Sequence, residues 1–343
     1  MSLTRNLWSE SKKGREIMSN ILEVRSLTTQ FESKNGPLTV VDKVDFTVKK
    51  GEVLGIVGES GCGKSVTSLS ILQLLGKRGR IPNGEVLYKN TNLLDIKEKE
   101  MKKVRGKELS MIFQDPMTSL NPVLTIGKQI GEVIEKHEKL RGAALKAKVV
   151  NLLNVVGIPR AEEIFYEYPH RLSGGMKQRV MIAMSIACNP ALLIADEPTT
   201  ALDVTIQAQI LDLLRSLKNE LDMSILLITH DLGVVAEMCD RVVVMYAGQV
   251  VETTDTRTLL RNPKHPYTVG LLQSTPEHSK GERRLRSIPG QVPTPDQYPA
   301  GCRFADRCPK TMNICRSSVP PVFEVDNQTS CRCWLYSKEE DVI

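Results

Sequence analysis

The sequence is poor in long hydrophobic runs. Among its 343 residues, no stretch approaches the roughly 18 consecutive apolar residues that indicate a membrane-spanning helix. The N-terminal stretch MSLTRNLWSESKKGREIMSN also lacks the apolar segment of a secretory signal, so we expect a cytosolic chain that reaches a membrane only through partners. We interpret residues 1–20 as an N-terminal extension, of vector origin in one alternative, with Met18 as an alternative start.

Charge of one sign is not concentrated in the sequence. Lys and Arg number 46 and Asp and Glu 40, a net charge of +6, and the basic clusters KRGR at 77–80 and ERRLR at 282–286 are short. Such short runs are typical of solvated surface. Because aromatic residues make up only 4% of the chain, few rings are available to stack on bases, and no nucleic acid is expected as a partner.

Cysteine is rare until the end of the chain. Only three cysteines precede the stretch from 302 to 333, which holds Cys302, Cys308, Cys315, Cys331 and Cys333. In a cytosolic chain this clustering indicates metal or redox chemistry rather than disulfides. The paired knuckles of zinc sites are absent, and wide spacing favours a [4Fe–4S] cluster on four thiolates, with zinc and free or oxidised thiols as the alternatives.

A phosphate-binding loop is the first motif present. Residues 53–65, VLGIVGESGCGKS, combine a short apolar strand, a glycine-rich turn and the start of a helix. Glycines let backbone N–H groups approach a phosphate chain, and a helix N-terminus adds partial positive charge. Lys64 is expected to reach the β and γ phosphates of ATP, and the Ser65 hydroxyl to bind Mg²⁺. The residues predicted to bind ATP here are Gly58, Glu59, Ser60, Gly61, Cys62, Gly63, Lys64, Ser65 and Val66.

An acid pair ends a second apolar strand, in ALLIADEPTTALD at 191–203. Asp196 is expected to hold Mg²⁺, and Glu197 to polarise the attacking water. A hydrophobic run that ends in two acids usually only caps a strand. Together with the loop at 58–65, however, the pair predicts the other half of a nucleotide triphosphatase.

A second glycine-rich helix start lies in RLSGGMKQR at 171–179. It is suited to another phosphate, because a helix N-terminus attracts anions. One chain with two phosphate-binding ends resembles the ATP-binding cassette (ABC) family, in which the signature motif of one subunit closes over the nucleotide held by another. The residues that the resemblance implies for this contact are Ser173, Gly174, Gly175 and Gln178.

Other motifs of that family follow in order. Gln114 in IFQDP resembles its Q-loop, Asp203 its D-loop and His230 in LLITHDL its switch histidine. The resemblance implies that Gln114 and His230 join Glu197 in catalysis. Phe31 stands where the family places an aromatic ring against adenine, with core packing as the alternative. The implied Mg²⁺ ligands are Ser65, Gln114 and Asp196.

The chain from about residue 21 onward most resembles the ATPases of dipeptide and oligopeptide importers. The matching stretches are MIFQDPMTSLNPVLTIGKQI at 111–130, DEPTTALDVTIQAQIL at 196–211 and HPYTVGLLQSTP at 265–276, and nickel importers share much of them. The resemblance implies a motor at the cytoplasmic face of the membrane, with a second ABC ATPase in a head-to-tail homo- or heterodimer, two permease subunits and an extracytoplasmic peptide-binding protein. Soluble ABC ATPases acting on DNA or ribosomes are the alternative class.

The expected fold is α/β: a P-loop ATP-binding cassette with a RecA-like core, an N-terminal antiparallel β subdomain and a helical subdomain, then a small irregular C-terminal metal-binding extension. We expect the cassette at 21–258, its helical subdomain at about 108–180 and the extension at 259–343. In peptide-importer ATPases the extension carries four cysteines, which implies a [4Fe–4S] site, expected here to act as a structural core rather than a redox sensor. RCWLY matches best through Cys333, with Cys331 as the alternate ligand.

Overall fold

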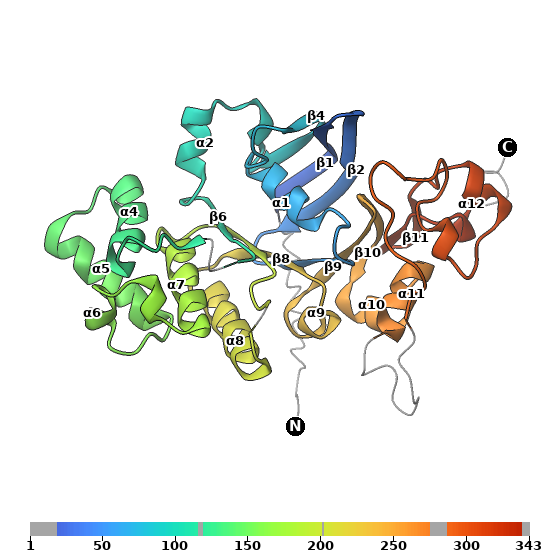
Figure 1. The fold of residues 1–343 in the computed structure, drawn as a ribbon. Coiled ribbons are helices and arrows are strands. Elements are labelled where there is room, and N and C mark those ends of the chain that lie inside the picture. Colours follow the sequence, from blue (N-terminus) through green and yellow to red (C-terminus); the bar gives the residue numbers. More distant parts are fainter. Residues whose placement is uncertain (1–18, 116–118, 201, 275–286, 338–343) are drawn as a thin grey trace, which may run out of the picture.

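The structure is a computed structural model that describes residues 19–115, 119–200, 202–274 and 287–337 (Figure 1). Nearly all of the expected N-terminal extension and the basic cluster at 282–286 lie outside these residues. Within the described ranges, no helix combines the length and the apolar character needed to cross a membrane.

The first of two β-sheets is antiparallel and corresponds to the expected N-terminal β subdomain. Its strand order is β2-β1-β4-β5. Buried and exposed residues alternate along part of β1, where Leu22 and Val24 are buried and Arg25 is exposed, because one face of the sheet packs on the core. The elements are β1 (Asn20–Ser33), β2 (Gly36–Lys49), β4 (Gly79–Tyr88) and β5 (Thr91–Asn92), followed by η1 (Leu93–Asp95) and α2 (Glu98–Val104).

The second sheet has eight strands in the order β11-β12-β10-β9-β3-β8-β7-β6. Strands β9, β3, β8, β7 and β6 are parallel, and β10, β12 and β11 continue the sheet in antiparallel pairing. Strands β3, β7 and β8 are buried along their whole length, as continuous apolar runs covered on both faces should be. The bounds are β3 (Val53–Val57), β6 (Leu109–Ile112), β7 (Leu192–Asp196), β8 (Ser224–Thr229), β9 (Arg241–Tyr246), β10 (Gln249–Asp255), β11 (Phe323–Asp326) and β12 (Thr329–Cys331).

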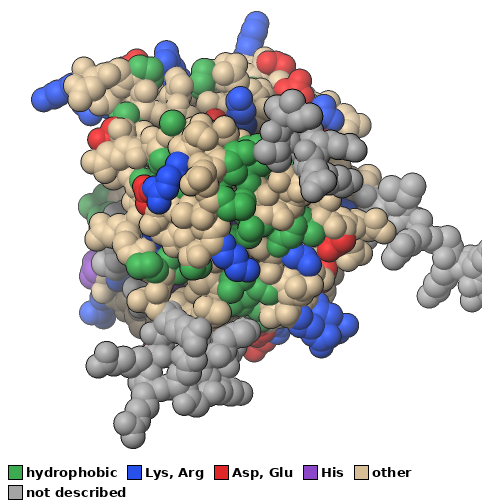
Figure 2. All heavy atoms as spheres, turned by 90° about the vertical axis from the view of Figure 1, so that its right-hand side faces the viewer, with side chains coloured by type: hydrophobic (Ala, Val, Ile, Leu, Met, Phe, Trp, Pro, Cys, Tyr) green, Lys and Arg blue, Asp and Glu red, His purple; other side chains and the backbone are tan. Residues whose placement is uncertain are grey.

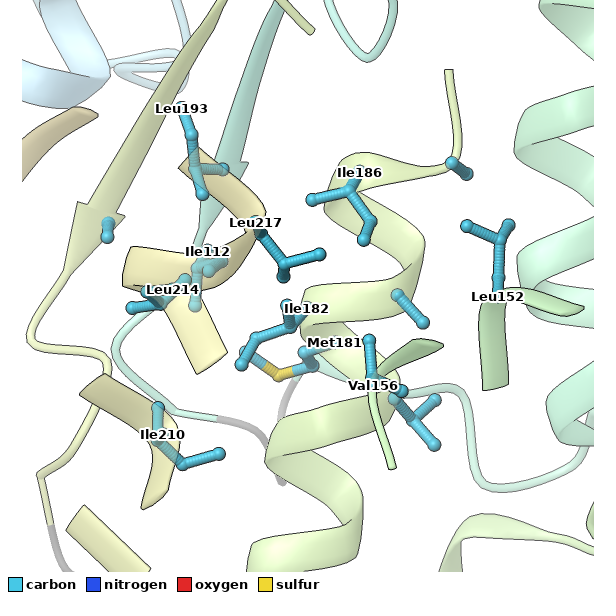
Figure 3. Packing of buried hydrophobic residues seen from close by; sticks show 14 of the residues in the cluster. Ile112, Leu152, Val156, Met181, Ile182, Ile186, Leu193, Ile210, Leu214 and Leu217 are labelled. Atoms are coloured by element: carbon cyan, nitrogen blue, oxygen red, sulfur yellow. The ribbon is translucent and has the colours of Figure 1, made fainter. Parts of the chain in front are cut away.

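Successive residues of the parallel strands point into two different hydrophobic cores. Leu54 of β3 packs in the core shared with the antiparallel sheet, whereas its neighbour Val53 packs in a core shared with helices. Figure 3 shows the helical core, where Ile182 and Ile186 approach Leu217 and the strands. The sheet is therefore fixed on both faces, which leaves the carboxyl ends of its strands to carry polar groups.

The helices of the expected helical subdomain lie on one side of the sheet (Figure 1). They follow β6, so the segment predicted at about 108–180 begins with a strand of the main sheet and only then becomes helical. The helices are α4 (Ile126–Glu138), α5 (Gly142–Val155), α6 (Ala161–Ile164), η2 (Pro169–Arg171) and α7 (Gly174–Ile186). The remaining helices of the cassette are α1 (Lys64–Ile71), α8 (Val204–Glu220) and α9 (Leu232–Met238).

The C-terminal extension is less irregular than expected, because two of its strands join the main sheet. Cys331 of β12 pairs with Glu252 of β10. Its Phe304 packs edge-on against Tyr246 of β9 and Tyr267, so the extension shares a core with the cassette. Figure 2 shows this face of the molecule, with several hydrophobic patches among basic side chains. The elements are α10 (Thr256–Arg261), α11 (Pro266–Gln273), η3 (Ala305–Arg307), α12 (Asn313–Ser317) and η4 (Trp334–Tyr336).

Candidate active site

The loop at 58–63 joins the end of β3 to the start of α1, as the motif predicts. Gly58 has a φ of 154° and Gly63 a φ of 100°, both in the region that favours glycine. A Cβ on Gly58 would collide with the backbone oxygen of Met245, so the loop needs glycine there for space as well as for conformation. The resulting turn ends at the N-terminus of α1, where backbone N–H groups are available for an anion.

Lys64, the first residue of α1, is buried, with an exposed fraction of only 5%. Its Nζ donates to the backbone oxygens of Gly58 at 2.7 Å and Glu59 at 3.1 Å. The ammonium group is thus held by two carbonyl oxygens of the loop, and it can exchange these for phosphate oxygens when a nucleotide binds.

The loop and the acid pair meet through one hydrogen bond. Ser65 Oγ donates to Asp196 Oδ1 at 3.0 Å, so two of the three predicted Mg²⁺ ligands are adjacent. Burial raises the pKa of Asp196 from its ordinary 3.8 to about 6, against the lowering effect of the Ser65 hydrogen bond. A hydroxyl beside a buried carboxylate is an oxygen-donor set of the kind that Mg²⁺ prefers.

Glu197 is held by three side chains that converge from separate segments. Gln114 Nε2 donates to its Oε2 at 3.0 Å, Thr200 Oγ1 donates to the same oxygen at 2.8 Å, and His230 Nδ1 lies 3.2 Å from Oε1. Burial raises the pKa of Glu197, but the bonds from Thr200 and His230 outweigh it and leave the pKa below its ordinary value. Glu197 is therefore an ionised carboxylate at neutral pH.

The backbone of Glu197 is also unusual. Its φ of 46° is left-handed, a conformation that costs free energy in a residue with a Cβ. Its N–H donates to Ile228 O of the neighbouring strand at 2.8 Å, and Thr200 N–H donates to its carbonyl oxygen at 3.1 Å. These bonds hold Glu197 directly after the end of β7. The sequence does not predict the role of Thr200, because no pattern distinguishes it from an ordinary turn residue.

The start of the loop, at Gly58, Glu59 and Ser60, and Glu197 of the acid pair line one cavity of about 390 Å³. It brings together the predicted Glu59, Gln114, Glu197 and His230 with residues that the sequence did not suggest. One of these is Leu271 of α11, beyond the expected cassette. The lining residues are Val57, Gly58, Glu59, Ser60, Gln114, Glu197, His230, Leu232 and Leu271.

The signature residues lie apart from this cavity. Ser173 caps α7, where its side chain accepts from Met176 N–H, and among the described residues it does not line the cavity. Gln178 Nε2 donates to Pro198 O at 2.6 Å, which joins α7 to the turn after the acid pair. Asp203 caps α8 by accepting from Ile206 N–H at 2.9 Å. One chain thus presents the loop and the signature helix at different places.

Phe31 is half-buried on β1, paired with Leu38 of β2 and Gly79 of β4. Its ring lies against Gly79, where an added Cβ would be 3.1 Å from Phe31 Cε1. It is not among the described residues that line the cavity, so its contact with adenine stays a prediction.

The cysteines of the extension are near one another but form no single-ion site. In the described part of the chain, no three His, Cys, Asp or Glu side chains are placed to hold a metal ion, so the expected metal-binding character of the extension has no support from this search. Burial raises the pKa of Cys333 to about 11, and the thiols of Cys302, Cys308 and Cys315 add to the rise. The pKa of Cys331 is raised by burial and then by Glu252 of the sheet.

A strand, a glycine loop and a helix that meet an acid pair at the carboxyl ends of parallel strands define a P-loop nucleotide triphosphatase. Comparison with known proteins supports this class. Residues 41–200 match the ABC transporter family model, and residues 251–315 match the model of the oligopeptide/dipeptide transporter C-terminal region. A solved structure of the ATP-binding cassette MJ0796, dimeric and bound to ADP and Pi, aligns with a TM-score of 0.60 at 29% identity, over 69% of this chain and 99% of that one.

Similar sequences narrow the class. The chain is 54% identical to the oligopeptide transport ATP-binding protein AppD of Bacillus subtilis, over 94% of this chain and 98% of that protein. It is 50% identical to the dipeptide transport ATP-binding protein DppD of Haemophilus influenzae, over 90% of this chain and 93% of that protein. The chain therefore belongs to the ATP-binding proteins of the oligopeptide and dipeptide ABC transporters. It is an ABC ATPase, as the sequence predicts.

Proposed function

We propose that this chain hydrolyses ATP at the loop 58–65 to drive the import of peptides through a membrane permease. The observation that carries the proposal is the convergence of Gln114, Thr200 and His230 on Glu197. Glu197 directly follows Asp196, which accepts the hydrogen bond from Ser65. This places an ionised carboxylate next to an oxygen-donor set and a buried lysine, which are the groups that phosphoryl transfer to water requires.

Ser65, Asp196 and Gln114 would hold Mg²⁺. Bound there, the ion would neutralise charge on the β and γ phosphates of ATP. Gln114 now donates to Glu197 Oε2, so its transfer to the nucleotide site would leave that oxygen with one side-chain donor, Thr200, and with a lone pair that can accept a proton from water. Lys64 would give up its bonds to the loop carbonyls and bind the phosphates, and His230 would contact the γ phosphate.

The site is expected to be completed by a second ATPase subunit. Ser173, Gly174 and Gly175 form a helix start that lies away from the chain's own cavity, which suits a nucleotide held by a facing subunit. Asp203 caps the neighbouring helix α8 and would lie at the same contact. The similar cassette MJ0796 is dimeric, which supports a pairing of two ATPase subunits.

A groove beside Gln114 suits the permease. It is an apolar pocket of about 220 Å³ between β6 and the helical subdomain, lined by Phe113, Met111 and Met184. Phe113 is 41% exposed although it is a large apolar residue, and it directly precedes Gln114. A permease helix seated here would be coupled to the nucleotide through Gln114. With this contact the chain would lie at the cytoplasmic face of the membrane.

Peptides are the proposed cargo because the C-terminal match and the similar sequences are those of oligopeptide and dipeptide transporters. A peptide-binding protein outside the membrane would supply them. Nickel import is the second candidate that the sequence left open, and the names of the similar proteins favour peptides over it.

Uptake of a labelled oligopeptide by cells tests this proposal. In cells whose own copy of the gene is deleted, the wild-type chain is expected to restore uptake. Lys64→Ala removes the charge that binds the phosphates and is expected to abolish it. Lys99→Ala, an exposed lysine on α2, serves as the matched control and should transport like the wild type.

Binding of ATP with Mg²⁺ is expected to weaken below pH 6. Asp196 must lose its proton to face a cation, and its pKa of about 6 means that protonation competes with Mg²⁺ from there downward. Between pH 7 and 5 we expect a loss of affinity of about tenfold. Because the folded state binds this proton more tightly than the unfolded chain, Asp196 stabilises the fold most below about pH 4, and that contribution is lost as the pH rises through 6.

The pH dependence is measured by titrating a fluorescent ATP analogue with Mg²⁺ across this range. Asp196→Asn is the control, because ATP itself also titrates. A variant whose affinity changes with pH as steeply as the wild type would exclude Asp196 as the source.

We propose in addition that Cys302, Cys308, Cys315 and Cys333 hold a [4Fe–4S] cluster. Such a cluster supplies a soft, thiolate-bound core that ties loops together. The thiols of Cys302, Cys308 and Cys315 all raise the pKa of Cys333, which supports this choice of ligands, and thiolates around four irons stand further apart than those around one ion. Cys331 is fully buried in β12 against Glu252, which makes it the less suitable ligand. Zinc is the alternative metal.

A further inference from the structure

An arginine of the extension binds the phosphate loop. Arg307 of η3 donates from Nη1 to Glu59 Oε2 at 2.7 Å and from Nη2 to Glu59 Oε1 at 2.9 Å. Glu59 is the second residue of the loop, 248 positions away in the sequence. The pair is bidentate, the geometry in which a guanidinium binds a carboxylate most strongly.

The guanidinium is fixed from other sides as well. Arg307 Nε donates to Pro289 O at 2.8 Å, and Nη1 also lies 3.3 Å from Tyr246 Oη. The residue is only 8% exposed. An arginine with this many partners has little rotamer freedom left, so it holds Glu59 at a defined place instead of following it.

The main chain of Glu59 is held by the same region. Its N–H donates to the hydroxyl of Tyr267 at 2.8 Å, and Tyr267 is a buried residue of α11. Both the backbone and the carboxylate of this loop residue are therefore bound by residues C-terminal to the part of the chain that matches the ABC transporter model. The extension therefore contacts the phosphate-binding loop directly.

The charge of Glu59 makes this contact matter for binding. Glu59 lines the cavity in which the triphosphate is proposed to bind, and its carboxylate would repel that anion. Two like charges a few ångströms apart at a partly buried site repel by energies that change affinity many-fold. Arg307 neutralises the carboxylate and holds both of its oxygens.

We propose that Arg307 is a positioning residue for nucleotide binding, which acts by holding and neutralising Glu59 of the phosphate loop. The inference rests on the proposed binding of ATP at 58–65. It predicts more than a stabilising contact, since the harm of losing Arg307 comes from the bare carboxylate that remains. Removing that carboxylate must then restore binding.

The test is a double-mutant cycle on binding of a fluorescent ATP analogue. Arg307→Met is expected to weaken binding about tenfold and to raise KM with a smaller change in kcat. The double variant Arg307→Met with Glu59→Gln is expected to recover most of the lost affinity. If the double variant binds as weakly as Arg307→Met alone, the inference is overturned, because a purely structural role predicts no recovery.

Two further variants provide a second test and a control. Glu59→Gln alone leaves Arg307 as an uncompensated cation and is expected to bind ATP more tightly than the wild type, so weaker binding there would also overturn the inference, even if Arg307→Met does not fold. Arg316→Ala breaks an exposed pair with Asp306 on the same extension and should leave binding unchanged. A wild-type chain that binds no ATP would instead refute the proposed function itself.

Discussion

Glu197→Gln is expected to lower the rate of ATP hydrolysis by about 10²–10⁴-fold while ATP still binds. The change replaces one carboxylate oxygen by an amide and keeps the size of the side chain. The hydrogen bonds from Gln114 and Thr200 go to one oxygen, which the amide can still offer. What is lost is the negative charge that accepts a proton from the attacking water.

Phosphate release at steady state measures this effect, and gel filtration with ATP and Mg²⁺ measures whether the subunits close into a dimer. The nucleotide should stay bound in the variant, so the dimer is expected to accumulate. Asp212→Asn is a matched control, because this exposed carboxylate on α8 accepts from Arg215 of the same helix and does not line the cavity. Undiminished hydrolysis by Glu197→Gln would remove Glu197 from the catalytic role.

Cys333→Ser is expected to abolish the iron and the acid-labile sulfide of the anaerobically purified protein. Cys333 precedes η4, and its thiol is the one that the other three thiols affect together. Cys331→Ser is expected to retain both, because Cys331 lies within β12, with its thiol affected first by Glu252 after burial. The two residues are two positions apart, so the comparison separates the ligand from its neighbour.

Cys188→Ser controls for the loss of a buried thiol elsewhere, in the turn that follows α7. Stoichiometric zinc without sulfide in the wild-type protein would end the iron–sulfur proposal. Because metal binding contributes folding free energy, the temperature at which the extension unfolds should fall together with the iron content in Cys333→Ser.

The sequence alone predicts those parts of the site whose residues are contiguous. The loop from Gly58 to Ser65 has to be a turn between a strand and a helix, and Asp196 with Glu197 has to end a strand, because the spacing of apolar and polar residues permits little else. The parallel sheet then brings the carboxyl ends of β3 and β7 together. The hydrogen bond between Ser65 and Asp196 follows from that topology.

Contacts between distant segments cannot be predicted in the same way. Thr200 sits in an ordinary turn, and only the left-handed backbone of Glu197 brings its hydroxyl onto the carboxylate. Arg307 lies between Cys302 and Cys308 in a stretch without periodicity, and it meets Glu59 because the extension packs on the cassette, with Phe304 against Tyr246. No periodicity records such a contact.

The extension illustrates the same limit at the level of the fold. Its proline-rich borders and scarce apolar residues predict an irregular appendage. The strand pairing of Cys331 with Glu252 depends on β10 having a free edge, which is a property of the whole sheet. Phe304 then completes an aromatic cluster with Tyr246 and Tyr267, so that the appendage becomes part of the cassette.

Peptide uptake against nickel uptake, measured in the same cells, tests the central claim most directly. Cells that carry the wild-type chain are expected to accumulate a labelled oligopeptide, and cells that carry Lys64→Ala are expected to accumulate none, with nickel uptake equal in both. Peptide uptake that is the same with either chain would contradict the account. So would a loss of nickel uptake alone in the Lys64→Ala cells.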